Sequence, residues 1–231
     1  MKTAGIVGGI APESTIQYYR LMIAACRERQ PDGSYPPILI NSIDMKAMLD
    51  LIGANDLAGV TTYLVAEVEK LAQAGADFAL FASNTPHIVF DGVQQQASIR
   101  LLSIVEAACD SAQGLGLKRV GLFGTRFTMQ GRFYADVFAQ KGISVVVPDA
   151  EDQEYIHSKY MSELVAGIFL PATRDRMLAI ASRLQEREKI DGLVLGGTEL
   201  PLLLENEGES TIPFLDTTRI HAESAVAQML S

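Results

Sequence analysis

The sequence predicts an α/β protein built as two pseudo-symmetric three-layer domains, each with a mainly parallel sheet, and with a cleft between them. Short apolar runs alternate with longer helical patterns along all 231 residues. This alternation is typical of βαβ units and parallel sheets. Segments of the first half also recur in the second half at nearly constant offsets. We expect residues 1–98 plus 210–231 to form the first domain and residues 99–209 to form the second.

The elements follow from the apolar runs and the helical spacing between them. The runs predicted as strands are residues 4–7, 38–43, 78–82, 101–104, 119–123, 145–147, 193–195 and 214–215. The predicted helices are residues 14–29, 56–74, 104–115, 128–141, 153–168, 173–188 and 219–230. In such sheets a ligand lies beyond the carboxyl ends of the strands, so the loops after the strands are the places to look for a site.

The internal repeat consists of three echoes in the same order. GIVGG at residues 5–9 returns as GLFGT at 121–125, and DFALFASNTP at 77–86 returns as DGLVLGGTEL at 191–200. LLSIVEAACDSA at 101–112 is loosely echoed by PFLDTTRIHAESA at 213–225. Three echoes in the same order at nearly one offset favour two copies of one α/β unit. The last echo follows the second copy, so we expect the C-terminal strand and helix to return to the first domain.

Composition and charge exclude several classes of protein. Hydrophobic residues make up 48% of the chain and charged residues 20%, which suits a buried core. The net charge of -9 argues against nucleic acid and anionic membranes as partners. No run approaches the roughly 20 apolar residues of a membrane span, and Gly8, Gly9 and Pro12 interrupt the N-terminal run too early for a signal peptide. We expect a cytoplasmic protein.

The two cysteines show no paired spacing. Cys26 and Cys109 lie in apolar helical contexts. They are predicted to be buried free thiols in a reducing compartment, and no metal site is expected.

The loop after the first strand is a candidate anion site. Gly8 and Gly9 permit a sharp turn that presents N–H groups, and Ser14 and Thr15 follow at the start of a helix. The alternative is an ordinary turn with Ser14 or Thr15 as the N-cap of the helix.

The loop after the third strand gathers small polar residues. Ser83, Asn84 and Thr85 precede Pro86, and together they suit a carboxylate ligand. Simple capping by Thr85 is the alternative. His87 follows in the first helical turn and is either structural or catalytic.

The second half repeats both loops. Ser83 and Gly197 each lie six residues after an aspartate, so they are equivalent positions on opposed walls of the expected cleft. Thr198 either caps the next helix or binds a carboxylate. Glu199 either pairs with a substrate amino group or is a first-turn acid. Thr125 and Arg126 are the matching candidates of the other loop, with Arg126 as a carboxylate clamp or a solvated charge.

The end of the second strand adds three weaker candidates. Asn41 and Asp44 are expected to line the same cleft, where Asp44 contacts an amino group or caps the next helix. Lys46, like Arg126, is a candidate for binding a side-chain carboxylate of the substrate.

These loops, together with residues 216–217 and 221–223, resemble the cofactor-independent aspartate/glutamate racemase family from the first strand to the last helix. The resemblance implies a two-domain α/β fold, a homodimer and neither pyridoxal phosphate nor metal. It also implies two cysteines that transfer protons on opposite faces of the substrate Cα, because inversion needs a group on each face. The two cysteine positions correspond here to Ser83 and Gly197, so the two-thiol mechanism is not open to this chain.

We therefore expect a racemase- or epimerase-like protein acting by Cα proton transfer on an acidic or related amino acid. Asn84, Thr85 and Thr198 are the expected carboxylate ligands, and Glu199 is a candidate to replace a thiol. One alternative is a lyase, decarboxylase or isomerase acting on a small carboxylic acid. Another is a non-catalytic protein that binds an amino acid or a dicarboxylate.

Overall fold

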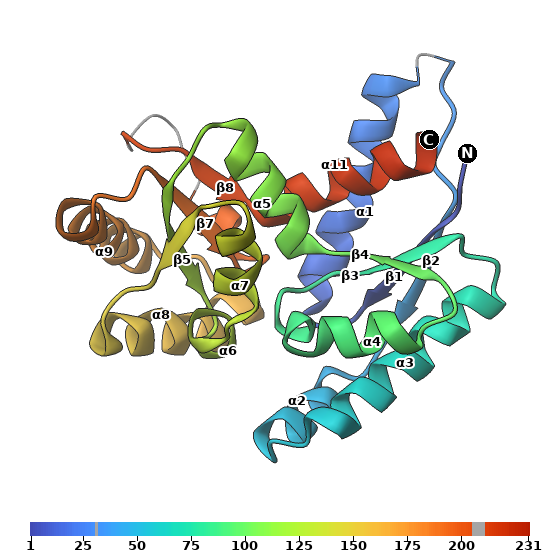
Figure 1. Cartoon of the computed structure of the whole chain (residues 1–231), viewed down its shortest axis with the longest axis horizontal. Helices are drawn as coiled ribbons and strands as arrows, with labels where there is room; N and C mark the ends of the chain where they lie inside the picture. The colour runs from blue at the N-terminus through green and yellow to red at the C-terminus, as the bar shows by residue number, and fades with distance from the viewer. Residues whose placement is uncertain (31, 205–210) are drawn as a thin grey trace. The chain divides into compact units, whose positions relative to one another are not determined.

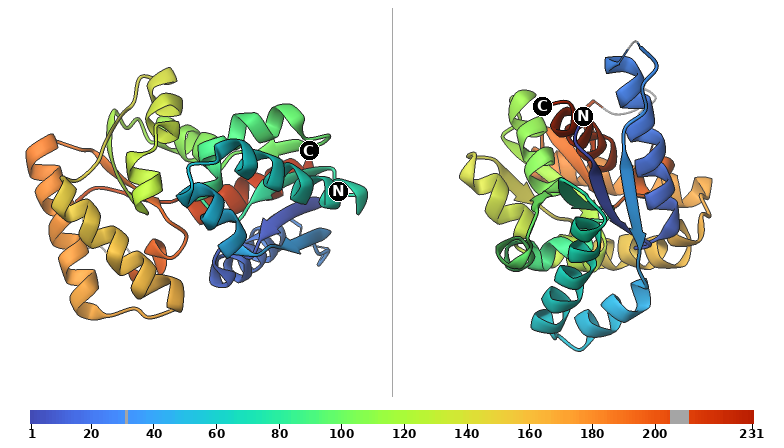
Figure 2. Two further views of the ribbon diagram at one scale, coloured as in Figure 1. Left: turned by 90° about the horizontal axis from the view of Figure 1, so that it is seen from below. Right: turned by 90° about the vertical axis from the view of Figure 1, so that its right-hand side faces the viewer.

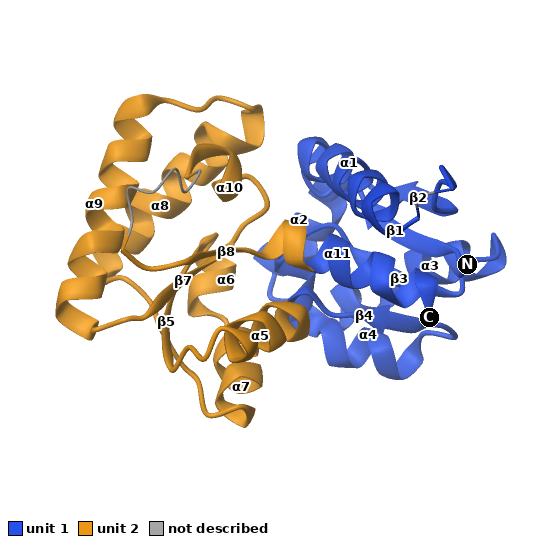
Figure 3. Cartoon of the chain, turned by 90° about the horizontal axis from the view of Figure 1, so that it is seen from above, with its two compact units in different colours: residues 1–104, 221–231 blue, residues 105–220 orange. Residues whose placement is uncertain are grey.

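The computed structural model describes residues 1–30, 32–204 and 211–231. They divide into two compact units, residues 1–104 with 221–231 and residues 105–220 (Figure 3). The chain therefore passes from one unit to the other before residue 105 and returns before residue 221. The expected boundary between residues 209 and 210 lies outside the described residues. None of the described helices is long and apolar enough to cross a membrane.

The first unit contains a four-stranded parallel sheet in the order β2-β1-β3-β4. Its strands are β1 (Ala4–Gly8), β2 (Ile38–Ser42), β3 (Phe78–Phe81) and β4 (Arg100–Leu102). Its helical elements are α1 (Pro12–Arg29), α2 (Met45–Gly53), α3 (Leu57–Gln73), η1 (Thr85–Val89), α4 (Phe90–Gln96) and the end of α11 (Thr217–Leu230). Figure 1 shows α1 and α11 on one side of the strands and α3 and α4 on the other.

The core of the first unit explains the return of the chain at residue 221. One cluster joins apolar side chains of α1, β1 and β3 to Ala222, Ala225, Val226 and Met229 of α11. The backbone N–H of Lys2 also donates to the carbonyl of Met229 at 2.8 Å. The two chain ends consequently lie side by side, as both views in Figure 2 show.

The second unit repeats this topology with the strand order β6-β5-β7-β8. Its strands are β5 (Arg119–Gly124), β6 (Ser144–Val146), β7 (Gly192–Gly196) and β8 (Phe214–Asp216). Its helical elements are most of α5 (Ile104–Gly114), α6 (Arg126–Gln130), α7 (Phe133–Gln140), α8 (Ala150–Ser162), η2 (Leu164–Ala166), α9 (Pro171–Glu188), α10 (Leu200–Leu203) and the start of α11. In Figure 3, α8 and α9 lie on one side of β5 and β7, and α5 and α7 lie on the other.

Four expectations need correction. Strand β4 pairs with β3, with Ala79 opposite Leu101, so residues 99–104 belong to the first unit and not to the second. Strand β8 pairs with β7, with Leu193 opposite Phe214, so residues 214–216 belong to the second sheet and not to the first. Of the C-terminal pair, only the helix returns to the first unit. The helix predicted at 128–141 is two helices, because Gly131 leaves the helical conformation with ψ 150° and ends α6. The helix predicted at 153–168 is also interrupted, and η2 follows α8.

Both cysteines are free and buried, as the sequence predicted. Cys26 lies in α1 and Cys109 in α5. Each thiol lies near a backbone carbonyl of its own unit: Cys26 is 3.8 Å from the oxygen of Ser34, and Cys109 is 3.9 Å from that of Val137.

Candidate functional site

The loop after β1 turns sharply into α1. Gly9 has φ +79°, which is accessible to glycine at little cost, and its N–H donates to Thr15 Oγ1 at 2.9 Å. Helix α1 begins at Pro12, and its N-cap is Ala11, which makes no side-chain capping bond. Ser14 and Thr15 therefore lie inside the first turn, and the alternative in which one of them is the N-cap was wrong.

The Ser14 hydroxyl joins this loop to the end of β3. It lies 2.8 Å from the carbonyl oxygens of Ala82 and Ala11 and 3.2 Å from that of Ile10. A hydroxyl has one proton to donate, so these three acceptors share it. Ser14 fixes the residue immediately before Ser83, and it brings together two of the loops that the sequence singled out.

The loop after β3 is buried where the polar residues were predicted. Ser83, Asn84 and Thr85 expose 8%, 3% and 7% of their surface. The following η1 is a 3-10 helix of five residues, and its N-cap Asn84 makes no side-chain capping bond. So short a helix adds little dipole, and the polarity of this loop comes from its own hydroxyl, amide and backbone groups.

His87 is a neutral group in this region. Its Nε2 accepts from the backbone N–H of Ile104 at 3.2 Å, so the ring proton belongs on Nδ1. The ring stacks on Phe90 with centroids 4.9 Å apart. Burial, aided by His221, lowers the pKa of His87 to about 3, although the carbonyls of Asn84 and Ser83 act in the opposite direction. At neutral pH, His87 carries no charge with which to hold a carboxylate.

The candidates after β2 have partners within their own unit. The amide of Asn41 donates to the backbone oxygen of Glu67 at 3.1 Å and to its carboxylate at 2.7 Å. Asp44 caps α2 by accepting from the N–H of Lys46 at 2.9 Å, which is the capping role that the sequence left open. The ammonium group of Lys46 forms an exposed ion pair with Asp50.

The loop after β7 holds a buried polar cluster. Glu199 is 0% exposed and Thr198 is 4% exposed. The Thr198 hydroxyl donates to Glu199 Oε2 at 2.8 Å, and the phenol of Tyr160, from α8, donates to the same oxygen. Thr198 therefore does not cap the next helix, and α10 has only four residues.

Tyr160 stays protonated over the ordinary pH range. Burial raises its pKa well above 10, and the neighbouring Glu199 carboxylate raises it further. The phenol is consequently a fixed proton donor to the carboxylate rather than an anion.

The loop after β5 is organised around Thr125. This residue is the N-cap of α6, and its Oγ1 accepts from the N–H of Thr128 at 3.3 Å and lies 3.2 Å from the Thr128 hydroxyl. Arg126 forms an ion pair with Glu154 at 2.5 Å. The guanidinium expected to clamp a substrate carboxylate is thus paired with a side chain of α8.

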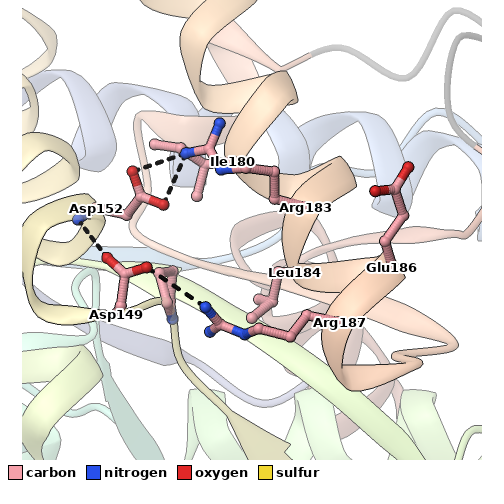
Figure 4. Close-up of a pocket in the computed structure, with 8 residues that line it drawn as sticks. Asp149, Asp152, Ile180, Arg183, Leu184, Glu186 and Arg187 are labelled. Atoms are coloured by element: carbon pink, nitrogen blue, oxygen red, sulfur yellow. Dashed lines mark hydrogen bonds and ion pairs between the residues drawn. The ribbon is translucent and has the colours of Figure 1, made fainter.

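A separate pocket of about 410 Å³ lies between the start of α8 and α9. Figure 4 shows four of its charged side chains directed at one another in two ion pairs: Arg183 lies 2.7 Å from Asp152, and Arg187 lies 3.4 Å from Asp149. None of the residues predicted for the site lines this pocket.

Tyr160 is the functional candidate that the sequence did not single out. Ile156, Tyr160 and Leu164 follow each other at intervals of four, a spacing typical of the buried face of a helix. All three do belong to the core of the second unit. Only the phenol oxygen distinguishes Tyr160 from its apolar neighbours, and the sequence gives no sign that it meets Glu199.

Comparison with known proteins gives matches that extend over nearly the whole chain. The profile of the Asp/Glu/Hydantoin racemase family matches residues 7–225. The broad specificity amino-acid racemase RacX of Bacillus subtilis is 27% identical over 232 residues, with 98% of each chain covered. The structure of an aspartate racemase homologue from Pyrococcus horikoshii matches this chain with TM-score 0.87 and 33% identity. The structure of an Asp/Glu racemase candidate from Yersinia pestis matches it with TM-score 0.91 and 31% identity. Both matches cover 100% of this chain and 100% of the other chain. With a family match that spans nearly its whole length, this chain belongs to the Asp/Glu/hydantoin racemase family.

Proposed function

We propose that this protein transfers a proton at the Cα of an acidic or related amino acid, using its own side chains and no pyridoxal phosphate. The observation that carries the proposal is the matched pair of buried polar loops after β3 and β7, the equivalent strands of two sheets with the same order. One supplies Ser83, Asn84 and Thr85, and the other supplies Gly197, Thr198 and Glu199. The similarity to a broad specificity amino-acid racemase supports an amino acid as the substrate.

The proton cannot pass through the two thiols that the family resemblance implies. Those positions are Ser83 and Gly197 by that resemblance, and this correspondence remains a prediction. Cys26 and Cys109 do not replace them, because both are buried in α1 and α5 rather than in these loops. Burial also raises the pKa of Cys109, which suppresses the reactive thiolate.

A reaction on one face of Cα is the second candidate, and the inequality of the two loops favours it. The loop after β7 contains a carboxylate with a phenol bound to it, whereas the loop after β3 contains a serine and is followed by the neutral His87. Inversion needs acid–base groups on both faces, but a lyase, decarboxylase or isomerase needs one. The expected homodimer stays a prediction.

Proton NMR in D2O separates these candidates. The protein is incubated with L- and D-amino acids and small dicarboxylates, and the same samples are analysed by chiral chromatography. Loss of the Cα proton signal with inversion is the expected result. Exchange without inversion, or new resonances, would select the one-face reaction. A panel in which every Cα proton persists and no substrate is consumed would contradict both, and thermal shifts by the same compounds would then favour a binding protein.

A further inference from the structure

The space beside Gly197 is filled by another residue. A Cβ placed on Gly197 would lie 3.0 Å from both the Cζ and the hydroxyl oxygen of Tyr160, and closer still to its Cε2. Real Cβ atoms almost never approach other heavy atoms so closely. The phenol of Tyr160 therefore stands where a longer side chain at position 197 would begin.

Tyr160 is held at this point by the core of the second unit. Its side chain, 6% exposed, packs in the same cluster as Ile156 and Leu164 of its own helical segment and Leu200 beyond the loop. Such packing leaves the ring little freedom to change rotamer. The hydroxyl position is consequently fixed relative to both Gly197 and Glu199.

The carboxylate of Glu199 is arranged to exchange protons with this phenol. Oε2 of Glu199 accepts from Tyr160 and, at 2.8 Å, from Thr198. Two donors on one oxygen fix the orientation of the carboxylate. Because all three groups come from α8 and from the loop after β7, they form a single preorganised unit.

We propose that Tyr160 and Glu199 together form one acid–base group for Cα proton transfer, in the place that the family resemblance gives to a thiol at position 197. This inference rests on the proposed function. In the removal step the Cα–H bond breaks and the phenol oxygen takes the proton. The original phenol proton passes at the same time to Glu199. The negative charge thus moves from the Glu199 carboxylate to Cα, where the adjacent carboxyl group of the substrate stabilises the carbanion. The reverse step returns the proton to Cα and the charge to Glu199.

The protonation state of the phenol suits this relay. Its raised pKa keeps the proton on the phenol oxygen at neutral pH, and the relay requires Glu199 to be the carboxylate that receives this proton. A phenol alone would be a poor base, but a phenol that passes its proton to a carboxylate gains the basicity of that carboxylate. Thr198 supports the arrangement as a positioning residue.

Three variants test the pair. Tyr160→Phe removes one oxygen and keeps the ring, and Glu199→Gln keeps the size of the side chain but removes its charge. Each should lower the rate of Cα exchange in D2O by about 100- to 10 000-fold, the usual worth of one acid–base group. The loss should be confined to the enantiomer whose Cα–H faces Tyr160. The matched control is Tyr134→Phe, a tyrosine of the same unit that is also buried and is bonded to Thr217.

The outcomes distinguish the inference from the proposed function. Wild-type protein that exchanges no Cα proton contradicts the proposed function and the relay with it. If the wild type is active and the folded Tyr160→Phe variant is equally active, the relay alone is overturned. The relay is also overturned if Tyr134→Phe loses as much Cα exchange as Tyr160→Phe, or if exchange falls equally for both enantiomers. If Tyr160→Phe does not fold, the enantiomer-selective loss in Glu199→Gln decides, and retention of exchange there refutes the pair.

Discussion

His221 is fully buried in the first unit and joins three of its elements. Its Nε2 lies 3.0 Å from the carbonyl oxygen of Leu102 in β4, and its Nδ1 lies 2.7 Å from the phenol of Tyr18 in α1. A carbonyl only accepts, so Nε2 carries the proton and Tyr18 donates to Nδ1. The bond from Tyr18 to Nδ1 needs a neutral ring, because a protonated Nδ1 cannot accept. The resemblance marked His221 as a family position, and the structure shows what it contacts.

The stability of the protein should therefore fall in weak acid. Burial lowers the pKa of His221 to about 4 in the folded state, against an ordinary value near 6.5. The unfolded chain takes up this proton more readily, so the contribution of the neutral ring is complete above pH 6.5 and is lost as the pH falls toward 4. The free energy of unfolding should decrease by about 1.4 kcal/mol per pH unit in this window for this histidine.

Urea unfolding at pH 7, 6 and 5 checks this expectation. A His221→Gln variant should be less stable at pH 7 but should lose less stability between pH 6.5 and 4 than the wild type. His157→Gln is the control, because that ring is only partly buried. The carboxylates titrate alike in all three proteins and cancel in the comparison. Parallel pH profiles for wild type and His221→Gln would contradict the assignment.

At the scale of elements, Asp77 and Asp191, which occupy equivalent positions in the internal repeat, make the same kind of contact in the two sheets. Asp77 precedes β3 and accepts from the N–H of Thr3 at 2.6 Å, just before β1. Asp191 precedes β7 and accepts from the N–H groups of Lys118 and Arg119 at 2.7 and 3.0 Å, at the start of β5. Each carboxylate clamps the beginnings of two adjacent parallel strands. The sequence repeat therefore preserves a local clamp as well as a strand pattern.

Removing these clamps should cost unequal amounts of stability. Asp191→Ala loses two hydrogen bonds from a half-buried carboxylate, and Asp77→Ala loses one from an exposed carboxylate. We expect a loss of about 1 to 3 kcal/mol for Asp191→Ala and less for Asp77→Ala. Denaturant unfolding measures both, with Asp110→Ala as the control for an exposed aspartate whose ion pair with Lys141 spans 4.0 Å. A loss no greater than that of the control would show that the clamps are not important.

Elements were predictable where the signal was local. Each predicted strand exists, because a short apolar run bounded by turn residues can be recognised without knowledge of its neighbours. The pairing of β8 was not predictable, because it depends on whether Phe214 lies beside Leu193 or in the other sheet. The same limit applies to the candidate site. Ser83 and Glu199 stand out at strand ends, but the meeting of Tyr160 with Gly197 joins positions 37 residues apart through the packing of α8.

At the scale of the whole molecule, the order of the two units along the chain should be interchangeable. The chain ends meet within the first unit, where Lys2 bonds to Met229 through the backbone and to Ser231 through its side chain at 3.2 Å (Figure 2). A short Gly/Ser linker can therefore join Ser231 to Met1 without strain. New ends can be opened between Leu115 and Gly116, which are exposed in the connection from α5 to β5.

This circular permutant should fold with an unchanged far-UV circular dichroism spectrum and a melting temperature within about 5 °C of the wild type. The reason is that no strand pair or helix is cut, while residues 221–231 and 1–104 become one continuous segment of the first unit. A second permutant with the same linker, opened inside β3 between Leu80 and Phe81, is the matched control. Both of these residues are 0% exposed, so it should not fold. If both permutants fail alike, the junction of the chain ends is at fault, and the stability of each unit depends on the present order of the two halves.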